Sequence, residues 1–150
     1  MFLVLVQVQM MRLLTLEGIT PDILAVWVVY LALKEGQMRA MFWGFGVGLF
    51  YDLWTGDFVG LSTLSMTICG FIAGYFYNEN KTQLTLGSYR FLLIVLAATF
   101  VHTTIYFIIF TRGTEIGLLR AITQFGITTT LYTATFTLLP MFGFARKYLT

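Results

Sequence analysis

Charged residues are scarce in this chain: Asp, Glu, Lys and Arg make up only 11% of 150 residues, about half the share usual in a soluble domain. Hydrophobic residues make up 58%. A soluble protein of this length could not hide that much apolar surface, so the composition excludes an ordinary soluble domain. It predicts a single domain, residues 1–150, built as an all-α polytopic membrane protein.

Cysteine and histidine are almost absent, with one residue of each, Cys69 and His102. A single cysteine excludes an intramolecular disulfide. One cysteine and one histidine also do not match the ligand spacing of a zinc or haem site. No set of nucleophile, base and orienting group can be assembled, so we expect no enzymatic activity, no catalytic residues, no metal and no cofactor. The net charge of +2 is small and scattered, which argues against a nucleic-acid partner.

Apolar runs separated by polar or turn residues predict six transmembrane helices, at about 2–16, 22–33, 38–54, 59–77, 89–110 and 116–140. The first run lacks a basic start and a small-residue cleavage site, so it is interpreted as a retained helix rather than a signal peptide. Twelve residues in the second run cover only about 18 Å of a hydrocarbon core of roughly 30 Å, so a full span and a re-entrant helix both stay open. Thr20 is expected to cap this helix with Pro21 in its first turn, and Pro140 is expected to kink or end the last helix.

The distribution of Lys and Arg predicts the orientation, because cytoplasmic loops of membrane proteins are enriched in these residues. If the N-terminus is inside, six cations lie in cytoplasmic segments and only Arg112 lies outside; the six are Lys34, Arg39, Lys81, Arg90, Arg146 and Lys147. Both termini are therefore predicted to be cytoplasmic.

Glycines recur at four-residue spacing in the middle of the chain, in the pairs Gly44/Gly48, Gly56/Gly60 and Gly70/Gly74. Small residues at this spacing let two membrane helices approach closely, so we expect the third and fourth helices to pack through them. The alternative for any single pair is that glycine is simply frequent in membrane helices.

Asp52 lies among these glycines, near the exterior end of the third helix. It could be an interfacial residue that reaches water, or it could be buried and paired with Arg12 or Arg120. His102 and Gln124 fall at a matching depth, so a buried polar cluster of Arg12, Asp52, His102, Arg120 and Gln124 is a candidate site. For His102 alone, a structural role and a proton relay both stay open, the first favoured. For Asp52 we favour a structural role that fixes the turn into the fourth helix.

Threonine is concentrated in the last helix, where its hydroxyls are expected to bond back to carbonyls of the same helix rather than line a cavity. The residues are Thr123, Thr128, Thr129, Thr130, Thr133, Thr135 and Thr137.

The segment from Gly44 to Leu64 reads Gly-Phe-x-x-Gly-Leu-x-x-Asp-x-x-x-Gly-x-x-x-Gly-Leu-x-x-Leu. This pattern resembles the signature of the MreD family, bacterial rod shape-determining membrane proteins. Further points of similarity are Gln7 and Gln9, Pro21-Asp22 at the start of the second helix, and Tyr30-Leu-Ala-Leu before a basic turn.

The resemblance implies a six-helix fold similar to the substrate-binding subunits of energy-coupling-factor transporters, in the bacterial inner membrane. It implies a non-catalytic scaffold in the cell-elongation complex that builds the lateral peptidoglycan wall. MreC would be the direct partner, with MreB, RodA and an elongation-class penicillin-binding protein reached through the complex. The alternative function is a small-molecule (vitamin)-binding transporter subunit on the same fold.

Overall fold

The computed structural model describes residues 22–56, 58–112 and 117–149, together with residues 2, 5, 6 and 9. All regular structure within these residues is helical, which confirms the all-α prediction. The long helices are α2 (Ile23–Glu35), α3 (Gln37–Thr55), α4 (Leu61–Tyr75), α6 (Tyr89–Thr111) and α8 (Ile127–Leu149). The short ones are α5 (Thr82–Leu86), α7 (Leu118–Ala121) and a π-helical turn, η1 (Ile122–Gly126). The first expected helix, about 2–16, lies largely outside the described residues.

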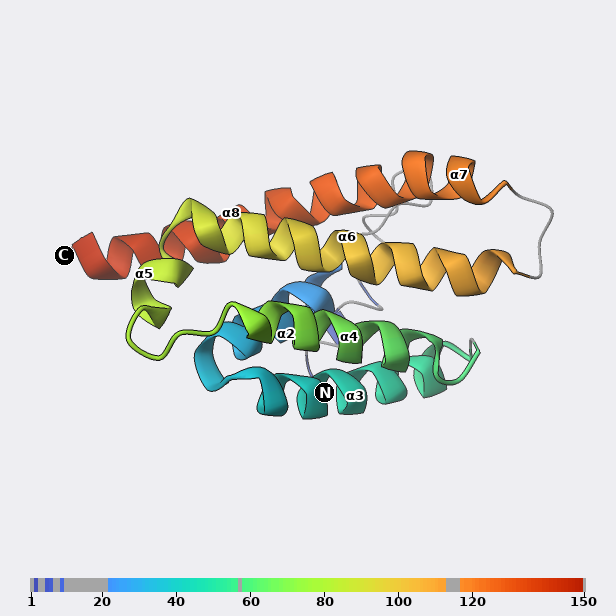
Figure 1. The fold of residues 1–150 in the computed structure, drawn as a ribbon, viewed down its shortest axis with the longest axis horizontal. Helices are drawn as coiled ribbons and strands as arrows, with labels where there is room; N and C mark the ends of the chain where they lie inside the picture. Colours follow the sequence, from blue (N-terminus) through green and yellow to red (C-terminus); the bar gives the residue numbers. More distant parts are fainter. Residues whose placement is uncertain are drawn as a thin grey trace.

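The long helices form two neighbouring pairs with α2 between them (Figure 1). Helices α3 and α4 run antiparallel across a short turn, and α6 lies beside α8. Helix α2 packs against α3, α4 and α6 and also touches α8. The second helix of the sequence is thus the central helix of the bundle.

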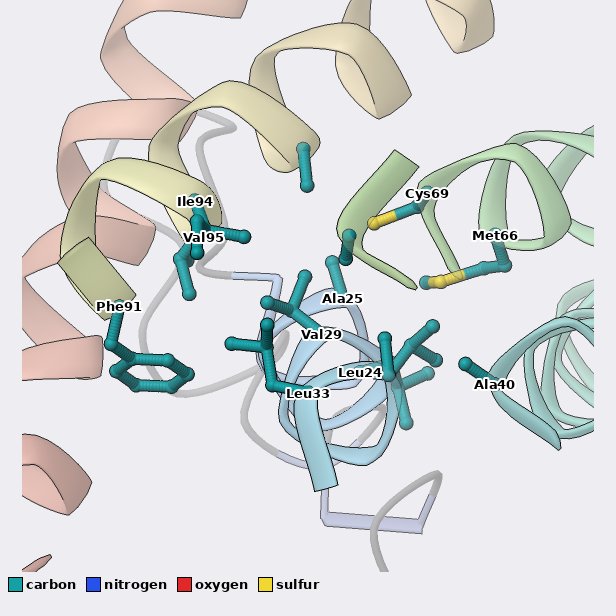
Figure 2. Close-up of a cluster of buried hydrophobic side chains, with 14 of the residues drawn as sticks. Leu24, Ala25, Val29, Leu33, Ala40, Met66, Cys69, Phe91, Ile94 and Val95 are labelled. Atoms are coloured by element: carbon teal, nitrogen blue, oxygen red, sulfur yellow. The ribbon is translucent and has the colours of Figure 1, made fainter. Parts of the chain in front are cut away.

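Burial of α2 follows from its sequence, because a helix that is apolar on all sides is stable only when it is enclosed. Leu24, Ala25, Val28 and Val29 have no exposed surface. Figure 2 shows their environment: Ala40 from α3, Met66 and Cys69 from α4, and Phe91, Ile94 and Val95 from α6 surround the α2 side chains. Thirteen residues make α2 about 20 Å long, so its neighbours shield a helix shorter than a bilayer core.

One helix within the described ranges is long and apolar enough by itself to cross a membrane, the stretch Tyr89–Ile109 of α6. Helix α4 is apolar but shorter.

The start of α2 differs from the expectation. The helix begins at Ile23, and the capping side chain is Asp22, whose Oδ1 accepts a hydrogen bond of 3.0 Å from the amide of Ala25. Thr20 and Pro21 lie outside the described residues. Aspartate is as good a cap as threonine, so the sequence offered two competing starts two residues apart.

The last helix also differs. It was expected over about 116–140, but the helical segment begins at Leu118, passes through η1, and α8 continues past Pro140 to Leu149. A proline removes one backbone donor, and membrane helices tolerate this loss where neighbouring helices support them. Met141, the next residue, is buried in the core and provides such support.

Candidate functional site

Four glycines lie in the crossing between α3 and α4, where they bring the two backbones into contact. A Cβ atom added at Gly48 would lie 2.6 Å from Thr63 Cα, and one at Gly44 would lie 2.7 Å from the Met66 carbonyl oxygen. Real Cβ atoms do not approach backbone this closely, so only glycine fits. Gly70 and Gly74 of α4 meet the backbone at the start of α3 in the same way.

Gly56 and Gly60 serve a different purpose from the packing expected for them. Both lie at the turn that joins α3 to α4, with φ of 71° and 105°, and a Cβ at either would meet nothing within 4 Å. Glycine is favoured here because other L-residues are strained at positive φ. These two residues shape the turn, and the other four form the crossing.

Asp52 is fully buried in the last turn of α3, with 0% of its surface exposed. Its Oδ2 accepts hydrogen bonds from the amide of Gly60 at 2.9 Å, the amide of Thr63 at 3.1 Å and the hydroxyl of Thr63 at 2.9 Å. Its Oδ1 accepts from the amide of Ser62 at 3.1 Å. A carboxylate on one helix therefore caps the amino end of the next one.

This arrangement explains how the bundle holds a buried charge at Asp52. The first amides of a helix have no partner within the helix, and the amino end carries a partial positive charge. Gly60, the residue at the cap position of α4, has no side chain with which to satisfy them. Asp52 supplies the missing acceptor, and the four donors in turn stabilise its negative charge.

The polar cluster expected around Asp52 is not assembled by the described residues. Arg120 and Gln124 are exposed, in α7 and η1. His102 is buried but its ion-pair partner is Asp22. Arg12 lies outside the described residues. The prediction matched residues by depth and looked for a cation, whereas the partners observed for Asp52 are backbone amides and a hydroxyl close by in the sequence.

A second buried carboxylate, Asp22, joins three helices at the amino end of α2. His102 Nε2 on α6 lies 2.8 Å from Asp22 Oδ2. The amide of Asp22 donates a hydrogen bond of 3.0 Å to the hydroxyl of Thr133 on α8. Asp22 is 9% exposed and His102 7% exposed, so both groups lie inside the bundle.

Sequence reasoning missed Asp22 as a site residue, although two signals were available. It directly precedes an apolar run, where an aspartate commonly caps a helix. The chain also has a single histidine within a strongly apolar segment, and such a residue needs a polar partner.

Most hydroxyls in the last helix bond within that helix, as expected. Thr123, Thr128, Thr130, Thr135 and Thr137 each donate to the carbonyl four residues earlier. Thr133 additionally receives the Asp22 amide. Among the residues placed by the structure there is no group of three His, Cys, Asp or Glu side chains that could hold a metal ion.

Comparison with protein families gives a match over nearly the whole chain. The family model described as "rod shape-determining protein MreD" matches residues 1–148. No curated protein and no solved structure matches the chain. The match covers nearly the whole sequence, including the α3–α4 crossing and both buried carboxylates. The chain therefore belongs to the MreD family of rod shape-determining membrane proteins.

Proposed function

We propose that this protein is a non-catalytic membrane scaffold of the bacterial cell-elongation complex, which binds MreC and thereby supports lateral peptidoglycan synthesis and rod shape. The observation that carries the proposal is the family match over residues 1–148. The described residues fit a scaffold, since nearly all of them belong to helices that pack on one another. Partners are then held through helix faces and short connections.

The proposed scaffold depends on the α3–α4 pair. The glycines of the crossing and the Asp52 cap fix these two helices against each other. A rigid pair presents a constant outer face, and on α3 that face carries Phe42, Trp43 and Phe45, which are exposed. Such side chains suit lipid or the single membrane helix of a partner. MreB, RodA and an elongation-class penicillin-binding protein would join through MreC, with membrane lipid around the bundle and no nucleic acid involved.

We further propose a multi-pass protein of the inner membrane, with six helices in a fold similar to the substrate-binding subunits of energy-coupling-factor transporters and with both termini cytoplasmic. The positions of two cation-bearing connections support this orientation. A Cβ at Gly36, between α2 and α3, would lie 3.7 Å from the Tyr77 ring, which follows α4. Both connections thus lie at one end of the bundle, and Lys34, Arg39 and Lys81 near them are exposed.

The test is co-purification of MreC from cells that express the tagged protein in place of the native one. We expect stoichiometric MreC with the wild type. Gly48→Leu, which forces a side chain into the α3–α4 backbone contact, should lose MreC and give round cells. Gly143→Leu on α8 is the control, because a Cβ at Gly143 meets nothing within 4 Å and Gly143 lies outside the α3 face proposed for partner contact. It should keep both MreC and rod shape.

Several results would contradict the scaffold. Full MreC recovery with Gly48→Leu would show that the crossing is not needed for partner binding. A tightly bound vitamin in the purified protein, without MreC, would favour the transporter-subunit alternative. Turnover of a lipid-linked wall precursor by the purified chain would show that it is an enzyme.

A further inference from the structure

Arg120 and Gln124 present polar side chains on the outside of the last helical segment. Both are exposed, and neither side chain makes a hydrogen bond or ion pair with a described residue. They lie one helical turn apart, so they share one face of the segment. Their polar groups are therefore free to bind a ligand outside the bundle.

The packing of η1 on α6 shows how deep these two side chains lie in the membrane. A Cβ at Gly126 would lie 3.9 Å from Thr103 Cγ2, so these residues of η1 and α6 lie at one level. The apolar stretch Tyr89–Ile109 of α6 ends about 9 Å beyond Thr103 along the helix. The last segment runs antiparallel to α6 (Figure 1). Gln124 therefore lies about 6 Å inside the end of the apolar stretch, and Arg120 lies about level with that end.

This order of a cation above an amide matches the head of a phospholipid. The phosphate of a phospholipid lies at the membrane surface, and its ester carbonyls lie a few ångströms deeper. The Arg120 guanidinium can hold a phosphate through paired N–H donors. The Gln124 amide, one turn deeper, can donate to an ester carbonyl. Such a bond removes the cost of an amide that would otherwise face hydrocarbon without a partner.

The same face becomes apolar below Gln124. Ile127 and Leu131 continue it and are exposed. The exposed hydroxyls of Thr128 and Thr135 donate to carbonyls of their own helix, so their donor hydrogens are already used. Free polar groups thus occur only at one end of the face. This distribution favours a lipid, whose polar groups all lie at one end, over a partner helix with polar groups along its length.

We propose that Arg120 and Gln124 form a binding site for one anionic phospholipid, with an acyl chain along Ile127 and Leu131. The lipid belongs to the leaflet at the α7 end of the bundle, which is the outer leaflet in the orientation proposed above. Gln124 lies in the middle of η1, and π-helical turns are frequent at functional sites. The inference goes beyond the scaffold function and does not depend on MreC binding.

The preference for an anionic lipid follows from the charge of Arg120. A guanidinium attracts the phosphate of any phospholipid, but the ammonium group of a zwitterionic headgroup repels it. Phosphatidylglycerol carries the phosphate without an ammonium group. It should therefore bind more tightly than phosphatidylcholine, which has the same ester carbonyls.

The test is a lipid titration of the delipidated full-length protein in a mild detergent, followed by native mass spectrometry. The wild type should take up one phosphatidylglycerol before any other, and more tightly than phosphatidylcholine. Equal binding of the two lipids would overturn the proposal.

Three variants separate this site from general attraction of anionic lipid. Arg120→Gln should weaken the first binding step at least about fivefold, because a charge-assisted pair is lost. Gln124→Leu should weaken it by about two- to fivefold without any change of charge. Arg112→Gln is the matched control, since it removes the same exposed charge from the end of α6, at the same end of the bundle. It should leave the first step unchanged.

The exposure of these side chains makes misfolding an improbable cause of any loss, and circular dichroism of each variant checks it. An equal effect of Arg112→Gln and Arg120→Gln would show general charge attraction, and the site would fail. So would an unchanged affinity with Gln124→Leu. If Arg120→Gln left lipid binding intact but lost a co-purifying membrane protein, the face would be assigned to a partner helix instead.

Discussion

Gly48 and Gly46 lie two residues apart on α3, and alanine at these positions should have opposite effects on stability. At Gly48 the new Cβ would lie 2.6 Å from Thr63 Cα and 2.9 Å from the Ser62 carbonyl oxygen. Nonbonded carbon atoms ordinarily lie about 3.5–4.0 Å apart. The two helices must therefore separate by about 1 Å at this point.

The magnitude follows from what this separation breaks. Overpacking of a well-packed site costs about 1–3 kcal/mol. Thr63 and Ser62 also donate to Asp52 through amides at 3.1 Å, and a shift of about 1 Å takes such a bond out of range at a further cost of about 1.5–3 kcal/mol. Alanine regains about 1 kcal/mol of helix propensity. Gly48→Ala should therefore lower the free energy of unfolding by about 2–5 kcal/mol.

Gly46→Ala keeps the propensity gain and meets no atom, so it should be neutral or raise the free energy of unfolding by about 0.5–1 kcal/mol. Both variants and the wild type would be unfolded with SDS in the same mild detergent, and helicity would be followed by circular dichroism. The sign of the difference between the two variants is the result that matters. If Gly48→Ala is as stable as Gly46→Ala, the backbone contact between α3 and α4 has been misjudged.

Three other perturbations test different parts of the fold. Asp52→Asn replaces an acceptor oxygen with a donor that faces backbone amides. It should lower the free energy of unfolding by about 2–4 kcal/mol in the same SDS titration. An unchanged midpoint would mean that the cap is dispensable. Gly60→Ala forces a side chain to φ of 105° and should cost about 1–2 kcal/mol in that assay although no atom is in the way; a silent substitution would argue that the turn relaxes freely. The orientation can be tested with single cysteines, in a cysteine-free background, at the exposed positions Met38, Glu79 and Phe58. An impermeant thiol reagent should label only position 58 in intact spheroplasts. Labelling at position 38 or 79 would reverse the orientation.

The middle helices could be located from the sequence because their apolar runs end at clear turn residues. The expected bounds of α3, α4 and α6 differ from the observed ones by at most two residues. The end of α8 could not be located from the sequence, because the helix continues past Pro140 where Met141 is buried, and this burial is a tertiary contact. Local propensity alone favours a helix end at the proline.

The candidate site was only partly accessible from the sequence, for two physical reasons. Asp52 was identified from its residue type. Its donors, however, are mainly the backbone amides of Gly60, Ser62 and Thr63. Nearly every residue type carries such an amide, so the pattern of side chains could not predict these partners. Asp22 and His102 come together only because α2 is enclosed by α6 and α8. Which helices become neighbours is a property of the assembled bundle, so periodicity within each helix could not predict the pair.

The two buried carboxylates acquire their partners at very different times during synthesis of the chain. Asp52 is followed within 11 residues by the four donors that the described residues give it, which corresponds to about 0.5–2 s of synthesis at 5–20 residues per second.

Asp22 is followed by Thr133 only 111 residues later, which corresponds to about 6–22 s. Over that interval the hairpin of α3 and α4 can already be complete, while the amino end of α2 still lacks its contacts with α6 and α8. A ribosome stalled before residue 102 thus leaves a finished hairpin beside an aspartate that still lacks its contacts with His102 and Thr133. Chains truncated before α6 should therefore be degraded faster than chains that reach Thr133, because the helices that pack around α2 are then incomplete.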